Sequence, residues 1–162
     1  MKKIDYLFRT KRISRIIETE KPRYLNFFLN SYKENLDHCK FNIKKFPRWS
    51  IISGYYAMHD VTKLFLADKF NIKIDFNVHQ TTIDVLSELI KDKEIVKMLN
   101  IGYNEFLNLL NDLVMAKAKR TNAQYYTGTA FMEEKYRQDA SKFLIITVIP
   151  YLNKIKSLKN AA

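Results

Sequence analysis

The chain has 162 residues, which is enough for one domain with a substantial core, and 47% of the residues are hydrophobic. Its 28 basic and 17 acidic residues give a formal net charge of +11, which favours an anionic partner such as nucleic acid. A single cysteine, Cys39, excludes an internal disulfide and a thiolate metal cluster. Only three glycines and three prolines are present, so the composition predicts long helices and an all-α fold.

The beginning of the chain is basic. Residues 2 to 18 predict a weakly amphipathic helix, so we expect residues 1–20 to form a basic N-terminal helix ahead of a bundle over residues 22–158. Its cations can follow a phosphate backbone or an acidic membrane surface, although a solvated face is the commoner role of such a run. These cations are Lys2, Lys3, Arg9, Lys11, Arg12 and Arg15.

Two strong helix signals follow. From Pro22 to Ile43 the apolar residues recur every three or four positions, and Phe46-Pro47 should end that helix. The next stretch, residues 50–69, is apolar or small on nearly every face. A helix of that kind is usually covered by protein on most sides, so we expect it to be the central helix of the domain. His59 within it is interpreted as a hydrogen-bonded core residue, and Cys39 as a buried, inert thiol.

The second half of the chain is less regular. Residues 70–78 alternate between apolar and polar side chains, a strand pattern, but no partner strand is evident, and we expect an extended loop or, less commonly, a short ribbon. Thr81 or Thr82 is predicted to cap a helix, and a short turn over residues 95–99 should lead to a stop at Gly102. A helix over 103–119 and a final helix to about 158, kinked at Pro150, complete the pattern. The prediction is a single domain over 1–162, an up-and-down bundle of five to six helices.

Two motifs on these helices form a recognisable combination. The central helix contains Ser53-Gly-Tyr-Tyr-Ala-Met-His-Asp-Val-Thr-Lys-Leu-Phe-Leu66, and Arg120-Thr-Asn-Ala-Gln-Tyr125-Tyr126 precedes the final helix. Together they resemble the HEPN domain family. His79 lies where many relatives carry a Thr-His-x-Gly motif, here Val78-His-Gln-Thr81 without the glycine.

The resemblance implies an up-and-down helical bundle, usually a homodimer with a cleft where two arginine-bearing helices meet. Many members are metal-independent ribonucleases of toxin–antitoxin and defence systems, which use an arginine followed after four to six residues by a histidine. Others lack that histidine and serve as RNA- or nucleotide-binding modules, or as partners of small nucleotidyltransferases. The family therefore includes enzymes and binding proteins.

This sequence departs from the nuclease pattern. The positions after Arg120 where the histidine should lie hold Tyr125, Tyr126 and Thr127. Attack by a 2′-hydroxyl needs a base near neutral pH, and tyrosine, with a reference pKa of about 10, is a poor substitute for histidine. We therefore expect weak or absent nuclease activity. The alternative is a ribonuclease toxin that uses Arg120 with Tyr125 or a distant histidine.

What remains is a basic and aromatic binding site. An arginine can hold phosphate through two hydrogen bonds, and tyrosine rings can stack on bases. The predicted RNA- or nucleotide-binding residues are Arg120, Lys117, Lys119, Asn122, Tyr125 and Tyr126. Two other interpretations stay open: Arg120 pairs with an internal carboxylate while the tyrosines pack in the core, or the chain only docks another protein through exposed apolar helix faces.

Other classes of site lack support in the sequence. It contains no glycine-rich phosphate loop, no paired Glu-x-x-His metal motif and no serine nucleophile turn, so no catalytic residues, metal or cofactor are expected. The N-terminus becomes charged too early for a secretory signal, and no apolar run approaches the roughly 20 residues that span a bilayer. A cytoplasmic protein is expected.

Overall fold

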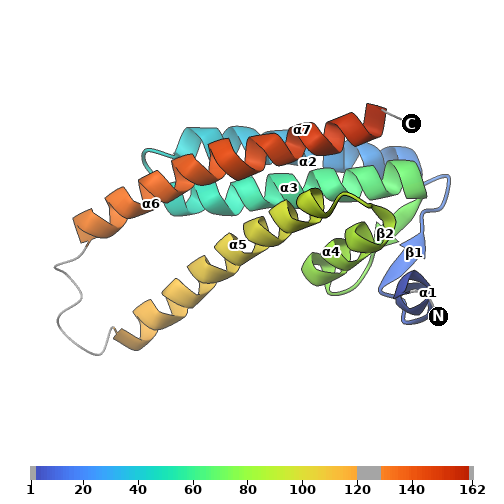
Figure 1. Ribbon diagram of the computed structural model, residues 1–162, viewed down its shortest axis with the longest axis horizontal. Coiled ribbons are helices and arrows are strands. Elements are labelled where there is room, and N and C mark those ends of the chain that lie inside the picture. The colour runs from blue at the N-terminus through green and yellow to red at the C-terminus, as the bar shows by residue number, and fades with distance from the viewer. Residues whose placement is uncertain (1–2, 120–128, 161–162) are drawn as a thin grey trace.

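The computed structural model describes residues 3–119 and 129–160, with side chains for residues 3–111 and 134–160. Its long elements run along the molecule in alternating directions (Figure 1). The all-α helical bundle is confirmed. The long helices are α2 (Lys21–Asn42), α3 (Pro47–Phe70), α5 (Lys93–Lys119) and α6 (Thr129–Phe143), which continues through a π-helical segment, η2 (Leu144–Val148), into α7 (Ile149–Asn160).

Helix α3 forms the centre of the bundle, as predicted from its apolar surface. It packs antiparallel to α2 and also contacts α5, α6 and α7. Tyr55, Met58 and Leu66 on α3 are completely buried, and they belong to one continuous core with residues from each surrounding helix. Most of the residues of α3 are buried, so its hydrophobic burial supplies much of the stability of the fold.

The two described glycines lie where helices approach closely. A Cβ atom on Gly54 would lie 3.1 Å from Cys39 Sγ, Phe143 Cε1 and Val148 Cγ2. A Cβ atom on Gly102 would lie 3.0 Å from Met58 Sδ. The predicted helix stop at Gly102 is therefore wrong: α5 continues through it, because the missing side chain lets α5 pack against α3.

The N-terminal prediction also needs correction. The helix expected over residues 2–18 is only the short helix α1 (Lys3–Arg9), and the chain turns at Lys11, whose φ is 55°. Strand β1 (Ile13–Arg15) then pairs antiparallel with β2 (Ile72–Ile74), with Ile13 opposite Ile74. The alternating segment 70–78 thus contains a strand, and its partner comes from the N-terminus. This ribbon lies with α1 and α4 at one end of the bundle (Figure 1).

Helix α4 (Val78–Leu89) begins earlier than expected. Asn77, with a φ of 46°, precedes its first turn, whereas Thr81 and Thr82 lie inside the helix and are completely buried. Their hydroxyls donate to the carbonyls of Phe76 and Val78, at 2.8 and 2.6 Å. The cap of α5 is Asp92, whose carboxylate accepts hydrogen bonds from the backbone N–H groups of Glu94 and Ile95.

Pro150 changes the helix type of the last long element. It lies directly after η2, and the N–H of Ile149 bonds to the carbonyl of Leu144, five residues earlier. A wider π-helical turn accommodates a proline, which lacks an N–H and crowds the preceding turn. The helix continues past this point in nearly the same direction, without the kink predicted at Pro150 (Figure 1). Within the described residues, no helix is long and apolar enough to cross a membrane.

The close packing at Gly54 can be tested. We predict that Gly54→Leu lowers the free energy of unfolding by about 1–3 kcal/mol, because the new side chain would overlap atoms from α2, α6 and η2. Urea denaturation followed by circular dichroism measures this change. Lys33→Leu, on the exposed face of α2, serves as the control and should change stability by no more than about 0.5 kcal/mol. Equal stability of the two variants would contradict the packing described here.

Candidate nucleic-acid interface

Of the binding residues predicted from the sequence, only two belong to a described helix. Lys117 and Lys119 belong to the last turn of α5, but their side chains lie outside the described residues. Arg120, Asn122, Tyr125 and Tyr126 also lie outside the described residues. The end of α5 and the beginning of α6 lie at the same end of the molecule as the turn between α2 and α3 (Figure 1).

That turn carries a dense group of cations and exposed aromatic rings. Pro47 starts α3, and Phe46 before it adopts a non-helical conformation, with φ −136° and ψ 62°. Phe41, Phe46 and Trp49 are 78%, 54% and 59% exposed. We call this region the corner surface and define it by His38, Lys40, Phe41, Asn42, Lys44, Lys45, Phe46, Arg48 and Trp49.

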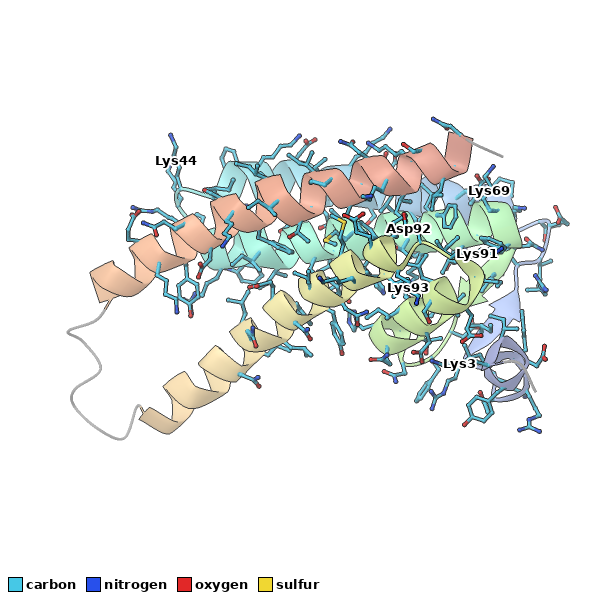
Figure 2. The ribbon with its side chains drawn as sticks, viewed as in Figure 1. Lys3, Lys44, Lys69, Lys91, Asp92 and Lys93 are labelled. Carbon is cyan, nitrogen blue, oxygen red and sulfur yellow. The ribbon has the colours of Figure 1, made fainter. Side chains whose placement is uncertain are left out.

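The corner surface is strongly positive. Lys40, Lys44, Lys45 and Arg48 are all exposed, and the sequence from residue 38 to residue 59 contains no acidic side chain. Lys40 lies 3.9 Å from Asp37 across one helical turn, a weak surface pair. The side chain of Lys44 points away from the bundle (Figure 2). Phosphate groups would therefore meet several cations here, arranged around one turn of the chain.

Helix α6 supports the turn from the side. Arg137 Nε donates a 2.9 Å hydrogen bond to the backbone carbonyl of Lys44, and Arg137 also pairs with Glu134 at 3.2 Å. The guanidinium of Arg48 lies 5.7 Å from the centre of the Tyr136 ring. These contacts hold the backbone of the turn against α6, and the exposed side chains of the turn extend from it into solvent.

A hollow of about 430 Å³ lies in the corner surface and is lined by His38, Asn42, Phe46 and Trp49. It is a shallow depression that is widely open to solvent. The hollow combines two aromatic rings with an imidazole and a carboxamide. It can therefore contact both the face and the polar edge of a planar ligand.

A chain of hydrogen bonds orients His38. Ser53 Oγ donates to the carbonyl of Trp49 at 2.7 Å, so its oxygen is available to accept a hydrogen bond. His38 Nδ1 lies 2.6 Å from that oxygen and therefore carries the proton that it donates. In the neutral ring Nε2 is then an acceptor. Asn42 Nδ2 donates to the carbonyl of His38 at 2.9 Å, which fixes the second polar side chain of the hollow.

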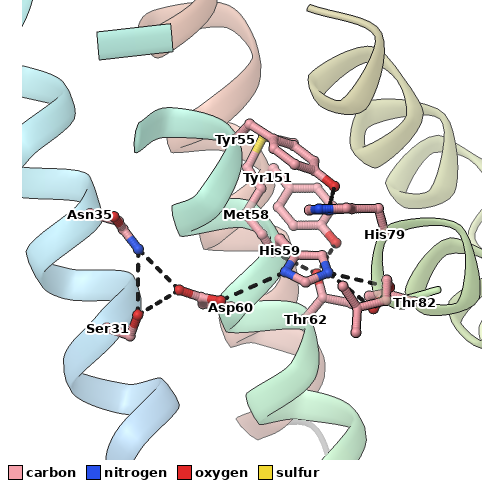
Figure 3. A network of polar contacts seen from close by, with 11 residues as sticks. Ser31, Asn35, Tyr55, Met58, His59, Asp60, Thr62, His79, Thr82 and Tyr151 are labelled. Carbon is pink, nitrogen blue, oxygen red and sulfur yellow. Dashed lines mark hydrogen bonds and ion pairs between the residues drawn. The ribbon is translucent and has the colours of Figure 1, made fainter. Parts of the chain in front are cut away.

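A separate polar network lies inside the bundle (Figure 3). The buried carboxylate of Asp60 accepts hydrogen bonds from Ser31 Oγ at 2.6 Å and from Asn35 Nδ2 at 3.0 Å. His59, only 3% exposed, places Nε2 3.2 Å from Thr82 Oγ1. The interpretation of His59 as a hydrogen-bonded core residue is confirmed. Cys39 is also buried as predicted, and burial raises the pKa of its thiol.

His79 is the most chemically distinctive member of this network. Its Nδ1 lies 2.7 Å from the hydroxyl of Tyr55, and its ring stacks on Tyr103 at a centroid distance of 5.5 Å. Burial lowers the pKa of His79 to about 4, and the nearby His59 and Lys63 contribute to this decrease. Asp60 acts in the opposite direction. His79 is therefore neutral at physiological pH, and Tyr55, whose pKa is raised mainly by burial, keeps its proton.

The chemistry of the described residues can be stated for metals and for His79. Within the described part of the chain, no three His, Cys, Asp or Glu side chains are arranged to hold a metal ion. His79 has a ring held among aromatic neighbours, and its Nδ1 is occupied by Tyr55. The corner surface was not singled out in the sequence, although its signal was present: four cations and three aromatic residues within residues 40–49.

Comparison of the chain with protein-family models, with curated proteins and with solved structures found no match.

The lowered pKa of His79 predicts a loss of stability in acid. An ordinary histidine titrates at 6.5 and His79 at about 4, so the unfolded chain binds more protons between these values. The free energy of unfolding should fall as the pH falls from about 6.5 to about 4, as urea denaturation across this range would measure. His79→Gln, which keeps a partner for Tyr55, should reduce that slope, whereas Gln80→Ala should not. An unchanged slope in His79→Gln would contradict the assignment.

Proposed function

We propose that the protein is a HEPN-like dimeric module that binds single-stranded RNA, or a nucleotide, through the basic and aromatic end of its bundle, without efficient nuclease activity. The observation that carries this proposal is the corner surface, where exposed cations and exposed aromatic rings alternate along one turn. The predicted residues Arg120, Tyr125 and Tyr126 follow α5 in the sequence and lie outside the described residues.

The physical basis is phosphate contact combined with base stacking. Each lysine or arginine that neutralises a phosphate releases a counterion, which makes affinity fall with salt. Each base stacked on an aromatic side chain contributes about 1–3 kcal/mol. Single strands expose their bases for stacking, whereas a duplex does not, so the exposed rings favour a single-stranded ligand.

The histidines leave the predicted Arg120 site without a nearby base. Cleavage would need a base beside the scissile phosphate and a cation for the phosphorane. The positions after Arg120 hold no histidine, and His59 and His79 form hydrogen bonds with Thr82 and Tyr55. The ribonuclease alternative would have to recruit Tyr125 or a distant histidine, of which His38 lies on the corner surface.

The proposal includes a second copy of the chain. Ile145, Ile146 and Ile149 are 66%, 59% and 37% exposed near the junction of η2 and α7, and apolar side chains gathered in this way support a contact between protein chains. A small nucleotidyltransferase is the partner protein that the HEPN resemblance suggests. Co-purification with such a protein would support that part of the proposal.

RNA binding should weaken steeply as the salt concentration rises. If the four exposed cations of the corner surface each neutralise a phosphate, the slope of log affinity against log salt is about −2.8. The affinity should therefore fall about 50-fold when the salt concentration rises from about 50 mM to about 200 mM. Fluorescence anisotropy of a labelled oligoadenylate measures this. Absence of binding at the lower salt concentration would remove the proposed function.

Matched lysine pairs locate the contact. Lys44→Ala/Lys45→Ala should weaken RNA binding and reduce the salt slope by about 1.4, because two phosphate contacts are lost. Lys91→Ala/Lys93→Ala is the control, since these exposed lysines lie away from the corner surface (Figure 2). Equal weakening by the two pairs would show that only the overall charge matters.

Arg120→Ala distinguishes the binding module from the ribonuclease. We expect it to weaken RNA binding, while the wild-type protein leaves the RNA intact on a denaturing gel. RNA cleavage by the wild-type protein that Arg120→Ala abolishes would instead support the ribonuclease. Unchanged affinity in Arg120→Ala would remove Arg120 from the site.

A further inference from the structure

We propose that the hollow lined by His38, Asn42, Phe46 and Trp49 holds one nucleobase of a single-stranded RNA, stacked on an aromatic ring with its polar edge toward His38 and Asn42. This inference rests on the proposed function and assigns the part of the corner surface that touches a base. It places that contact on the turn between α2 and α3, on residues that the resemblance does not implicate.

Two exposed aromatic rings border the hollow. Trp49 and Phe46 lie within three positions of each other and leave more than half of their surface in water. Covering such rings with a planar base removes apolar surface from water and gives the favourable stacking contact that single-strand binders use. Tyr55 on the same helix is, by contrast, completely buried.

Two polar side chains, His38 and Asn42, also line the hollow. The hydrogen-bond chain from Trp49 through Ser53 fixes the ring of His38 and leaves its Nε2 as an acceptor in the neutral form. The carboxamide of Asn42, 95% buried, is fixed through its bond to the His38 carbonyl. A nucleobase has donors and acceptors along its edge, so it matches this combination of an aromatic wall and fixed polar atoms.

The distribution of charge favours a strand over a free nucleotide. Lys40 lies on α2, Lys44 and Lys45 on the turn, and Arg48 on the first turn of α3, so the cations flank the hollow from both helices. One nucleotide brings its phosphates to one point, whereas a strand places a phosphate on each side of the bound base. The arrangement therefore fits a base with neighbours on both sides.

Trp49 provides a direct readout because it is the only tryptophan in the chain. A base stacked on its indole should quench the intrinsic fluorescence of the wild-type, full-length protein. The probes are a short oligoadenylate, an abasic ribose-phosphate strand of the same length, and adenosine monophosphate. We expect the oligoadenylate to quench Trp49 with the same midpoint as its binding curve. The abasic strand should leave the fluorescence unchanged and bind about 5- to 100-fold more weakly.

Variants test the same contact by anisotropy, without relying on tryptophan emission. Trp49→Ala and Phe46→Ala should each lower the affinity for oligoadenylate about 5- to 100-fold while keeping the wild-type salt slope, because no cation is removed. Phe27→Ala is the matched control: Phe27 is 61% exposed on α2 but lies outside the hollow, and its loss should leave the affinity unchanged. Circular dichroism confirms that each variant is folded.

The outcomes separate this inference from the proposed function. Salt-dependent binding of oligoadenylate without quenching of Trp49, and with wild-type affinity in Trp49→Ala, would overturn the base site and leave the proposed function intact. Quenching by adenosine monophosphate at the concentration that suffices for the strand would overturn the assignment to RNA in favour of a free nucleotide. Complete absence of RNA binding would overturn both.

Discussion

The structure depends on the enclosure of α3, because the polar side chains that are buried on this helix must be satisfied by the neighbouring helices. Asp60 receives hydrogen bonds from Ser31 and Asn35 on α2, and Thr62 bonds to Tyr151 on α7. Each such bond removes the cost of burying an unpaired polar group and fixes the position of the helix that supplies it. Hydrophobic burial thus gathers the helices around α3, while these pairs set how each one is oriented.

The same enclosure explains why the candidate interface lies on the turn between α2 and α3. The antiparallel pair leaves four residues, 43–46, to reverse the chain, with Pro47 beginning the next helix. Cys39, Ser50 and Ser53 occupy the inward positions around the turn, and their polar atoms form hydrogen bonds between α2 and α3. The large rings of Phe41, Phe46 and Trp49 therefore face outward among the cations. A rigid turn that presents rings and charges together can bind a strand without first being ordered.

Local patterns predicted the helices well and long-range packing poorly. The stripe beginning at Pro22 and the apolar surface of residues 50–69 gave α2 and α3, because helical period and burial are local signals. The pairing of Ile13 with Ile74 joins segments about sixty residues apart, which no local pattern reveals. Gly102 continues a helix because of Met58 on another helix. The corner surface was missed for a similar reason: whether Phe46 and Trp49 face outward depends on how the turn folds against α6.

Photochemical cross-linking of bound RNA, followed by mass spectrometry of the attached peptides, tests the central claim most directly. The account predicts cross-links on peptides that contain residues 38–49, with Trp49 or Phe46 as the modified side chain, and further cross-links in the segment that contains Tyr125 and Tyr126. Cross-links confined to the basic N-terminal residues 3–15, with none on the corner surface, would contradict it.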